Sequence, residues 1–292
     1  MNPPVLASLR DVLIGRRNTD GGWGYLPGKS SRIEPTCWSL LALASAGAQP
    51  IDPNVLIRWP RASGWLVDVA QAPVNYAFNA LAAMTLQSHP QGVAAAQQIA
   101  RQLVDVRGLR FEQGKEIRQD NSLQAWPWID ATFSWVEPTS LCLLLFKKMR
   151  GALPAAAAER ISVGERMLID RACAAGGWNY GGSNVYGQEL FPYVPTTALG
   201  LLALQDRQQD PTVARAVAWI RKEAGTEPSA QATALAVLSL KIYRSPVAEL
   251  EGALRKILET SVNELGTVGL AAGLYSLSMT KASGHGEAVF RL

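Results

Sequence analysis

The chain has 292 residues, of which 48% are apolar and 18% are charged, and it contains nine Trp. This composition excludes a disordered chain, which would be rich in charge and poor in aromatic side chains. The net charge of +4, without any run of five or six Lys or Arg, argues against a dedicated nucleic-acid-binding protein. The longest apolar run, from Trp38 to Ala48, is shorter than the ~20 residues that a membrane span requires.

The N-terminal stretch has no basic leader followed by a long apolar segment, so we expect no signal peptide. The three cysteines, Cys37, Cys142 and Cys173, are odd in number and lie within apolar helical patterns, which indicates buried, reduced thiols. These features favour a cytoplasmic protein. Peripheral contact with a membrane stays open.

One pattern recurs six times: a polar or Pro-containing entry, a Thr or small residue, and then Leu and Ala at helical spacing. The copies begin at Glu34, Val74, Glu137, Val194, Ser229 and Leu265. Pro is preset for the first helical turn, and a neighbouring Thr can cap the free amides there. The segments that follow are apolar on nearly every face, which is typical of buried, inner helices.

Between these copies lie stretches with a single apolar face, typical of outer helices: 4–15, 53–70, 91–106, 155–174, 211–224 and 248–261. Period-two alternation is nearly absent, so no sheet is expected. The alternation predicts a single all-α domain over residues 1–292, in which six helical hairpins close into an α/α toroid with inner and outer rings. An open superhelix is the alternative, disfavoured because the repeats are irregular in length and the inner helices so apolar.

Two long connections, 105–136 and 176–194, interrupt this regularity. Long loops in a compact domain are usually functional or disordered, and the many aromatic residues of these two argue against disorder. We expect both connections to fold over one rim of the ring and to shape its mouth.

The segments DGGWGY (20–25) and GGWNYGG (176–182) each follow an amphipathic stretch and precede an inner helix. They resemble the Gly-x-Trp turns of the squalene-hopene and oxidosqualene cyclases, and QAWPW (124–128) resembles a degenerate third copy. The resemblance implies a structural staple in which the glycines allow a reversal with positive φ and the Trp packs on the helix ends. A ligand contact for Trp23 and Trp178 is the alternative.

The stretch GGWGYLPGKSSRIEPTCW (21–38) is also similar to a signature of protein prenyltransferase β subunits, in which a His that opens an inner helix binds zinc. Here Pro35 stands at that position, and the two histidines, His89 and His285, lie elsewhere. A catalytic zinc requires three protein ligands, so the zinc chemistry does not carry over. The DxDD and DDxxD motifs of terpene cyclases are absent as well. We expect neither a metal nor a cofactor.

The resemblance to class II terpene cyclases places Glu137 where the family has its proton-donating Asp, and Glu34 occupies the same place in its own repeat. Asp130, in WIDATFSWVEP, could pair with Glu137. A desolvated ring interior would raise the pKa of such a carboxyl and make it a general acid. The alternative is structural: a carboxylate that stabilises the first turn of a helix, or, for Asp130, a turn aspartate.

Aromatic residues near the expected mouth are candidates for substrate binding: Trp126, Trp128, Phe133, Trp135, Trp38 and Tyr193. Such walls could bind a polyprenyl chain and stabilise carbocations, or they could form part of the core. Lys29, Arg32 and Arg118 could contact a diphosphate, or be solvated surface residues.

The resemblance implies a terpene-cyclase-like or prenyltransferase-like protein whose ligand is a hydrophobic isoprenoid-type molecule. Whether it is an enzyme, and whether it needs a partner subunit, stays open. One alternative is a non-catalytic lipid-binding or scaffold ring. The other is a six-hairpin carbohydrate-active enzyme, in which Trp platforms hold sugars and Asp130, with Glu137 or Glu189, acts on the glycosidic bond.

Overall fold

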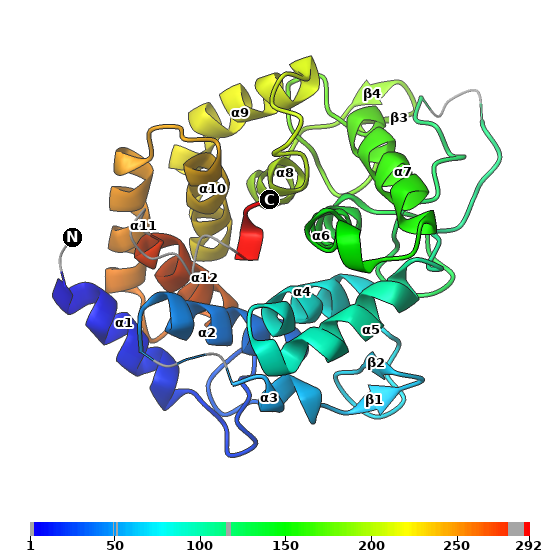
Figure 1. Cartoon of the computed structure of the whole chain (residues 1–292). Coiled ribbons are helices and arrows are strands. Elements are labelled where there is room, and N and C mark those ends of the chain that lie inside the picture. The colour runs from blue at the N-terminus through cyan, green and yellow to red at the C-terminus, as the bar shows by residue number, and fades with distance from the viewer. Residues whose placement is uncertain (1–2, 49, 51, 115–117, 280–288) are drawn as a thin grey trace.

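The computed structural model describes residues 3–48, 50, 52–114, 118–279 and 289–292. Within these ranges, twelve α-helices alternate between an inner and an outer layer (Figure 1). The inner helices are α2 (Ile33–Ser45), α4 (Tyr76–Gln87), α6 (Val136–Lys148), α8 (Val194–Ala203), α10 (Ala230–Ile242) and α12 (Thr267–Ser278). The outer helices are α1 (Pro3–Gly15), α3 (Asn54–Ile57), α5 (Val93–Leu103), α7 (Ala156–Asp170), α9 (Pro211–Glu223) and α11 (Ala248–Thr260). Short 3-10 turns lie at 90–92, 150–152 and 224–226.

The inner helices form a closed ring. Each packs on the next in chain order from α2 to α12, and α12 packs back on α2 (Figure 1). The two ends of the repeat array are also joined by hydrogen bonds from Arg16, whose guanidinium donates to Leu265 O at 2.7 Å and to Val262 O at 2.8 Å. The predicted α/α toroid is therefore confirmed, and an open superhelix is excluded.

The inner helices are buried on nearly all faces, as their Ala- and Leu-rich sequences predict. In α10, for example, Leu235, Val237 and Leu238 point in different directions around the helix axis, and none is more than 3% exposed. Burying a Leu or Val side chain contributes roughly 1.5–3 kcal/mol, so the burial of these helices strongly favours folding. The outer helices bury one face against it.

The stretch 53–70 was expected to form an outer helix, and this prediction is wrong beyond its first turn. Helix α3 ends at Ile57 and is followed by a hairpin of β1 (Arg61–Ala62) and β2 (Trp65–Leu66). Pro60 cannot continue a helix, and the turn residues Ser63 and Gly64 have φ values of 50° and 89°. A second hairpin joins β3 (Asn184–Val185) and β4 (Gln188–Glu189). Both are local, so no sheet layer forms in the described residues.

The C-terminal residues 289–292 lie inside the ring, near its axis (Figure 1). Phe290 is fully buried and stacks on Trp38 of α2, with ring centroids 5.3 Å apart, and it meets the ring of Tyr275 in α12 edge-on. Its carbonyl accepts a hydrogen bond from the Gln205 amide, just after α8. The chain's own end therefore fills the part of the ring interior between these three inner helices.

Candidate active site at the mouth of the ring

Tryptophan staples fix the loops that enter the ring. The indole N–H of Trp23 donates to Leu13 O in α1 at 2.8 Å, and its backbone N–H donates to the Thr36 hydroxyl in α2 at 2.9 Å. The same two bonds recur at Trp178, whose indole donates to Leu168 O and whose backbone N–H donates to the Thr197 hydroxyl. They recur again at Trp126, with Leu103 O and the Thr139 hydroxyl as acceptors. All three indoles are at most 1% exposed, so they are structural staples and not ligand contacts.

Trp126 was also expected in the substrate-binding wall, and this expectation has to be corrected. Its ring is 0% exposed and packs edge-on against Phe146 in α6. The guanidinium of Arg160 covers its other side at 4.3 Å from the ring centroid. The degenerate motif QAWPW is thus a true third staple, and a substrate cannot reach its first tryptophan.

A fourth connection of this kind could not be recognised from the Gly-Trp pattern, because Leu66 stands where the other connections have tryptophan. Asn79 is the fourth residue of α4, as Thr36 is of α2. Its side chain accepts from the backbone N–H of Leu66 and donates to Leu66 O, both at 3.0 Å. An amide here replaces the hydroxyl of the other repeats.

The glycines of the staples are required by their backbone conformation and by close packing. Gly21 and Gly177 have φ values of 87° and 81°, in the region that favours glycine. A Cβ on Gly177 would also lie 2.5 Å from the hydroxyl oxygen of Thr197. The Gly-Gly-Trp pattern therefore follows from the geometry of the turn.

Each loop also caps the inner helix that precedes it around the ring. The first backbone N–H of α4 donates to Trp128 O, that of α6 to Tyr180 O, and that of α12 to Tyr25 O, at 2.8–2.9 Å. The first N–H of α2 donates to the Asp68 carboxylate at 2.7 Å. These bonds gather the loops around the N-terminal ends of the inner helices, and we call this end of the ring the mouth.

Two glutamates of the mouth, Glu34 and Glu137, interact electrostatically. They are the second residues of α2 and α6, and both side chains are partly exposed. Burial raises the pKa of Glu137 to about 7, and the charge of Glu34 adds to this rise. Burial likewise raises the pKa of Glu34 to about 7. There, a hydrogen bond from the Tyr25 hydroxyl, at 2.8 Å, favours the ionised form, and the charge of Asp68 opposes it.

Both carboxyl groups change their charge near neutral pH, so each can hold or release a proton there. When Glu34 is ionised and held by Tyr25, its charge helps Glu137 to keep its proton. A pair of carboxyl groups in different environments is a common basis for assigning a general acid and its partner. The two glutamates predicted as catalytic candidates thus come together in the fold.

Asp130 does not join this pair directly. It is exposed and accepts a hydrogen bond of 2.5 Å from the hydroxyl of Tyr76, the first residue of α4. Burial raises the pKa of Tyr76 above its ordinary value, and the hydrogen bond and charge of Asp130 add to this. Asp130 therefore anchors the loop before α6 to α4, in line with its structural alternative.

The other aromatic candidates divide between the mouth and the interior. Trp128 is partly exposed and meets Phe78 edge-on at 5.9 Å, whereas Phe133 is 41% exposed and stacks on Trp135 at 4.7 Å. Tyr193 is 50% exposed and lies against Tyr180. Trp38, by contrast, is 4% exposed and covered by Phe290, so it is a core residue here.

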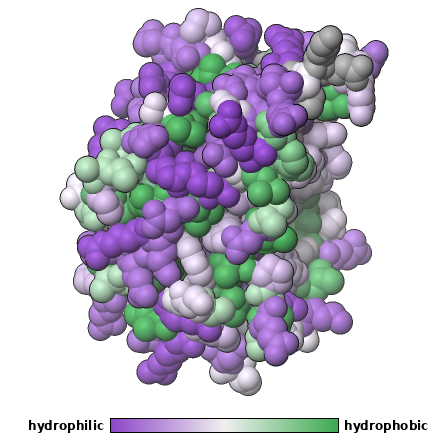
Figure 2. Space-filling model, turned by 90° about the vertical axis from the view of Figure 1, so that its right-hand side faces the viewer, coloured by the Kyte–Doolittle hydropathy of each residue, from purple (hydrophilic) through white to green (hydrophobic). Residues whose placement is uncertain are grey.

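The two long connections enclose a pocket of about 890 Å³, which we call the aromatic pocket. Its walls carry Phe133, Trp135, Tyr180, Val185, Tyr186, Leu190, Phe191 and Tyr193. Figure 2 views the side of the molecule where these connections lie, and hydrophobic residues there emerge between hydrophilic ones. The expectation that both connections shape the mouth is confirmed on this side of the ring.

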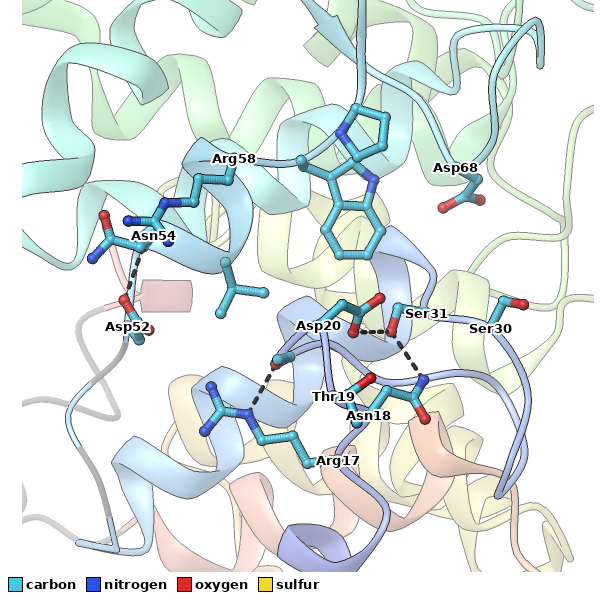
Figure 3. Close-up of a pocket in the computed structure, with 14 residues that line it drawn as sticks. Arg17, Asn18, Thr19, Asp20, Ser30, Ser31, Asp52, Asn54, Arg58 and Asp68 are labelled. Carbon is cyan, nitrogen blue, oxygen red and sulfur yellow. Dashed lines mark hydrogen bonds between the residues drawn. The ribbon is translucent and has the colours of Figure 1, made fainter.

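A second, more polar pocket of about 760 Å³ lies beside the short helix α3 (Figure 3). Asp20 accepts a hydrogen bond from Ser31 at 2.7 Å, and Arg17 donates to Gly21 O at 3.0 Å, so these side chains shape the turn that carries the first staple (Figure 3). Asp68 lines this pocket as well as capping α2.

No group of three His, Cys, Asp or Glu side chains suitable for a metal occurs among the described residues. All three cysteines are buried and free, as predicted. His89 caps a 3-10 turn, and His285 lies outside the described residues. Arg118 is paired with Glu189 at 2.7 Å, and Lys29 is exposed. No helix in the described part of the chain is long and apolar enough to cross a bilayer.

The chain matches no protein-family model and no curated protein. Among solved structures it is similar to an α-1,6-mannanase of Salegentibacter sp. HEL1_6 in complex with α-1,6-mannotriose, with a TM-score of 0.62, 9% identity and 99% of each chain covered. It is also similar to a β-1,3-1,4-glucanase from Paenibacillus sp. X4 (TM-score 0.58, 12% identity, 94% of this chain and 90% of that chain).

A type II terpene cyclase from Scytonema is similar at a TM-score of 0.52 and 17% identity, over 89% of this chain and 79% of that chain. Identities this low show the fold alone. The α/α toroid of this protein is thus one that glycoside hydrolases and a terpene cyclase share.

Proposed function

We propose that the protein is a carbohydrate-active enzyme that cleaves a glycosidic bond at the mouth of the ring. The observation that carries this proposal is the pairing of Glu34 and Glu137 at the N-terminal ends of two inner helices, each with a pKa raised to about 7. Glycoside hydrolysis requires two carboxyl groups, one protonated and one ionised, on either side of the scissile bond.

In this proposal Glu137 is the general acid and Glu34 the base or nucleophile. The hydrogen bond from Tyr25 stabilises the ionised form of Glu34. The charge of Glu34 in turn favours the protonated form of Glu137. This division of roles replaces the pairing of Asp130 with Glu137, because the Asp130 carboxylate is engaged by Tyr76.

The partly filled ring interior also supports a glycan over an enclosed isoprenoid. A cyclase must surround its carbocations with a dry cavity, whereas Phe290 fills the part of the interior between α2, α8 and α12 here. Around the mouth, partly exposed rings such as Trp128 are open to a ligand from solvent. Aromatic faces beside carboxyl groups suit the apolar face of a sugar and its glycosidic oxygen.

The test is hydrolysis of defined glycans, measured as the release of reducing ends. Linear α-1,6-mannan and mixed-linkage β-1,3-1,4-glucan are the first substrates to try, because the similar enzymes carry these names. We expect Glu137→Gln and Glu34→Gln each to lower kcat by about 10²–10⁴-fold. Glu159→Gln, at an exposed position of α7, is the matched control and should leave kcat unchanged.

The pH profile separates catalysis from a merely structural role. In the wild-type protein kcat/KM should fall above about pH 7, as Glu137 loses its proton. Because the charge of Glu34 contributes to that pKa, the residual activity of Glu34→Gln should begin to fall at a lower pH. Full activity of Glu137→Gln on every glycan that the wild type cleaves would refute the proposal.

A second candidate is an isoprenoid-related activity, favoured by one observation. The Gly-Trp staples that resemble those of terpenoid cyclases form in this fold with the hydrogen bonds described above. A carboxyl group with a pKa near 7 could also protonate an alkene. Conversion of squalene or farnesyl diphosphate, lost in Glu137→Gln, would favour this candidate over glycan cleavage.

A further inference from the structure

The aromatic pocket adjoins the catalytic pair on the side of Glu137. Trp135, in its wall, is the N-cap residue of α6, two positions before Glu137. Tyr180, also in the wall, accepts the first backbone hydrogen bond of α6 through its carbonyl. Burial raises the pKa of Tyr180, and the charge of Glu137 adds to that rise. A ligand in this pocket would therefore contact Trp135 and Tyr180, which lie next to Glu137.

The charged and amide side chains of the pocket are used by the loops themselves. Arg171 pairs with Asp170 and donates to Gly181 O, and Asn179 accepts from the backbone N–H of Gly181. Asn184 accepts from the Gly187 N–H within the β3–β4 turn. These bonds hold the walls in place. What the pocket offers a ligand is therefore mainly aromatic and aliphatic surface.

The rim of the pocket carries the two most exposed large hydrophobic side chains of the described residues, Phe191 at 80% and Tyr186 at 78%. Neither is needed for core packing at such exposure. Apolar surface left open beside a cavity is typical of a ligand-binding site. A cavity of about 890 Å³ is within the range of pockets that bind small molecules.

Resting on the proposed function, we propose that the aromatic pocket binds an apolar aglycone, so that the substrate is an amphipathic glycoside with an alkyl, acyl or isoprenoid chain. The general acid of a glycosidase protonates the oxygen of the leaving group, and the leaving group is the aglycone. A pocket on the Glu137 side is thus in the position where an aglycone would lie.

The reaction is a balanced hydrolysis. The bond between the anomeric carbon and the aglycone oxygen breaks, and the proton of Glu137 passes to that oxygen, which leaves as an alcohol. Water supplies the oxygen that replaces it on the anomeric carbon, and the second proton of that water restores the acid. The apolar alcohol stays in the aromatic pocket until it dissociates.

The experiment measures binding of methyl, hexyl and octyl β-D-glucoside, below their micellar concentrations, by isothermal titration calorimetry. The dissociation constant should fall by up to about fourfold for each methylene group that the pocket buries. Phe191→Ala removes an exposed rim side chain without touching the core, and should weaken binding of octyl glucoside about tenfold. Ile14→Ser, at an exposed hydrophobic position of α1, is the matched control and should bind like the wild type.

Equal dissociation constants for methyl and octyl glucoside would overturn the proposal, as would octyl binding that Phe191→Ala leaves unchanged. Glu137→Gln separates this proposal from the proposed function. It should retain the dependence on chain length while losing hydrolysis. Chain-length-dependent binding without hydrolysis of any glycoside would refute the proposed function and leave the apolar specificity of the pocket standing. Hydrolysis without chain dependence would refute the aglycone proposal alone.

Discussion

Replacing Glu137 with Gln should stabilise the protein at alkaline pH, although it removes a proposed catalytic residue. The folded protein raises the pKa of Glu137 to about 7, from the 4.5 of an ordinary Glu side chain. The folded state therefore holds a proton that the unfolded chain has already released between these two pH values. The free energy of unfolding then falls as pH rises from about 4.5 to about 7, and the whole cost is present above pH 7.

The magnitude follows from the size of this rise. At 1.36 kcal/mol for each pH unit, ionising Glu137 in the folded protein costs about 3 kcal/mol. Its position at the N-terminus of α6 returns roughly 0.3–1 kcal/mol of this through the helix dipole. We expect Glu137→Gln to be about 2–3 kcal/mol more stable than the wild type at pH 8. At pH 4.5, where the folded side chain is protonated and the unfolded one is half ionised, the difference in stability should shrink to about 0.4 kcal/mol.

Urea unfolding followed by tryptophan fluorescence at pH 4.5, 6 and 8 measures this difference. The exposed variant Glu159→Gln is the control, because its side chain is not desolvated on folding. Two results would show that the folded protein does not disfavour the ionised form of Glu137. One is a stability difference that does not depend on pH, and the other is a Glu137→Gln protein that is less stable than the wild type at pH 8. Stability gained by removing a catalytic charge is a common trade-off in enzymes.

The other two predictions concern the staples and the filled ring. Thr139→Val should lower the free energy of unfolding by about 1–3 kcal/mol, because the buried backbone N–H of Trp126 loses its acceptor. The control Thr260→Val, on the surface of α11, should cost less than about 0.5 kcal/mol. Equal melting temperatures for the two variants would contradict the staple. Phe290→Ala should lower the free energy of unfolding by about 3–5 kcal/mol and leave a cavity against Trp38. Benzene should partly refill this cavity and raise the melting temperature of the variant. A loss of stability below about 1 kcal/mol would mean that the C-terminal residues do not fill this part of the ring in solution.

The closed ring could be predicted from local patterns because its elements depend on them. A helix that is apolar on every face has to be an inner helix, whatever lies around it. The Glu-Pro-Thr entries mark helix starts, and the structure confirms that α2 and α6 begin one residue earlier, at Ile33 and Val136. The Gly-Trp turns recur because the same hydrogen bonds are made in each hairpin. The expected outer helix at 53–70 failed at Pro60, a signal that was present in the sequence.

The assignment of individual aromatic residues could not be made from the sequence. Trp126 and Trp128 are two residues apart in one motif, yet the first is a buried staple and the second lies at the mouth. Spacing alone does not distinguish them, because side chains two residues apart in an extended segment are expected on the same face. Only the packed helices decide which of the two rings is buried. The position of Trp38 depended on the distant residue Phe290, which no local pattern could reveal.

The amino-acid sequence by itself determined the number and order of the helical hairpins, their inner and outer roles and the staples, because these follow from periodicity and turn chemistry within short segments. The tertiary structure alone decided that Glu34 and Glu137, from different hairpins, interact at one mouth, and that the C-terminal residues occupy the ring. Closure of the ring brings these segments together, and the resulting loss of water around the carboxyl groups raises their pKa values. Chemistry at this site is therefore a property of the closed ring and not of any one repeat.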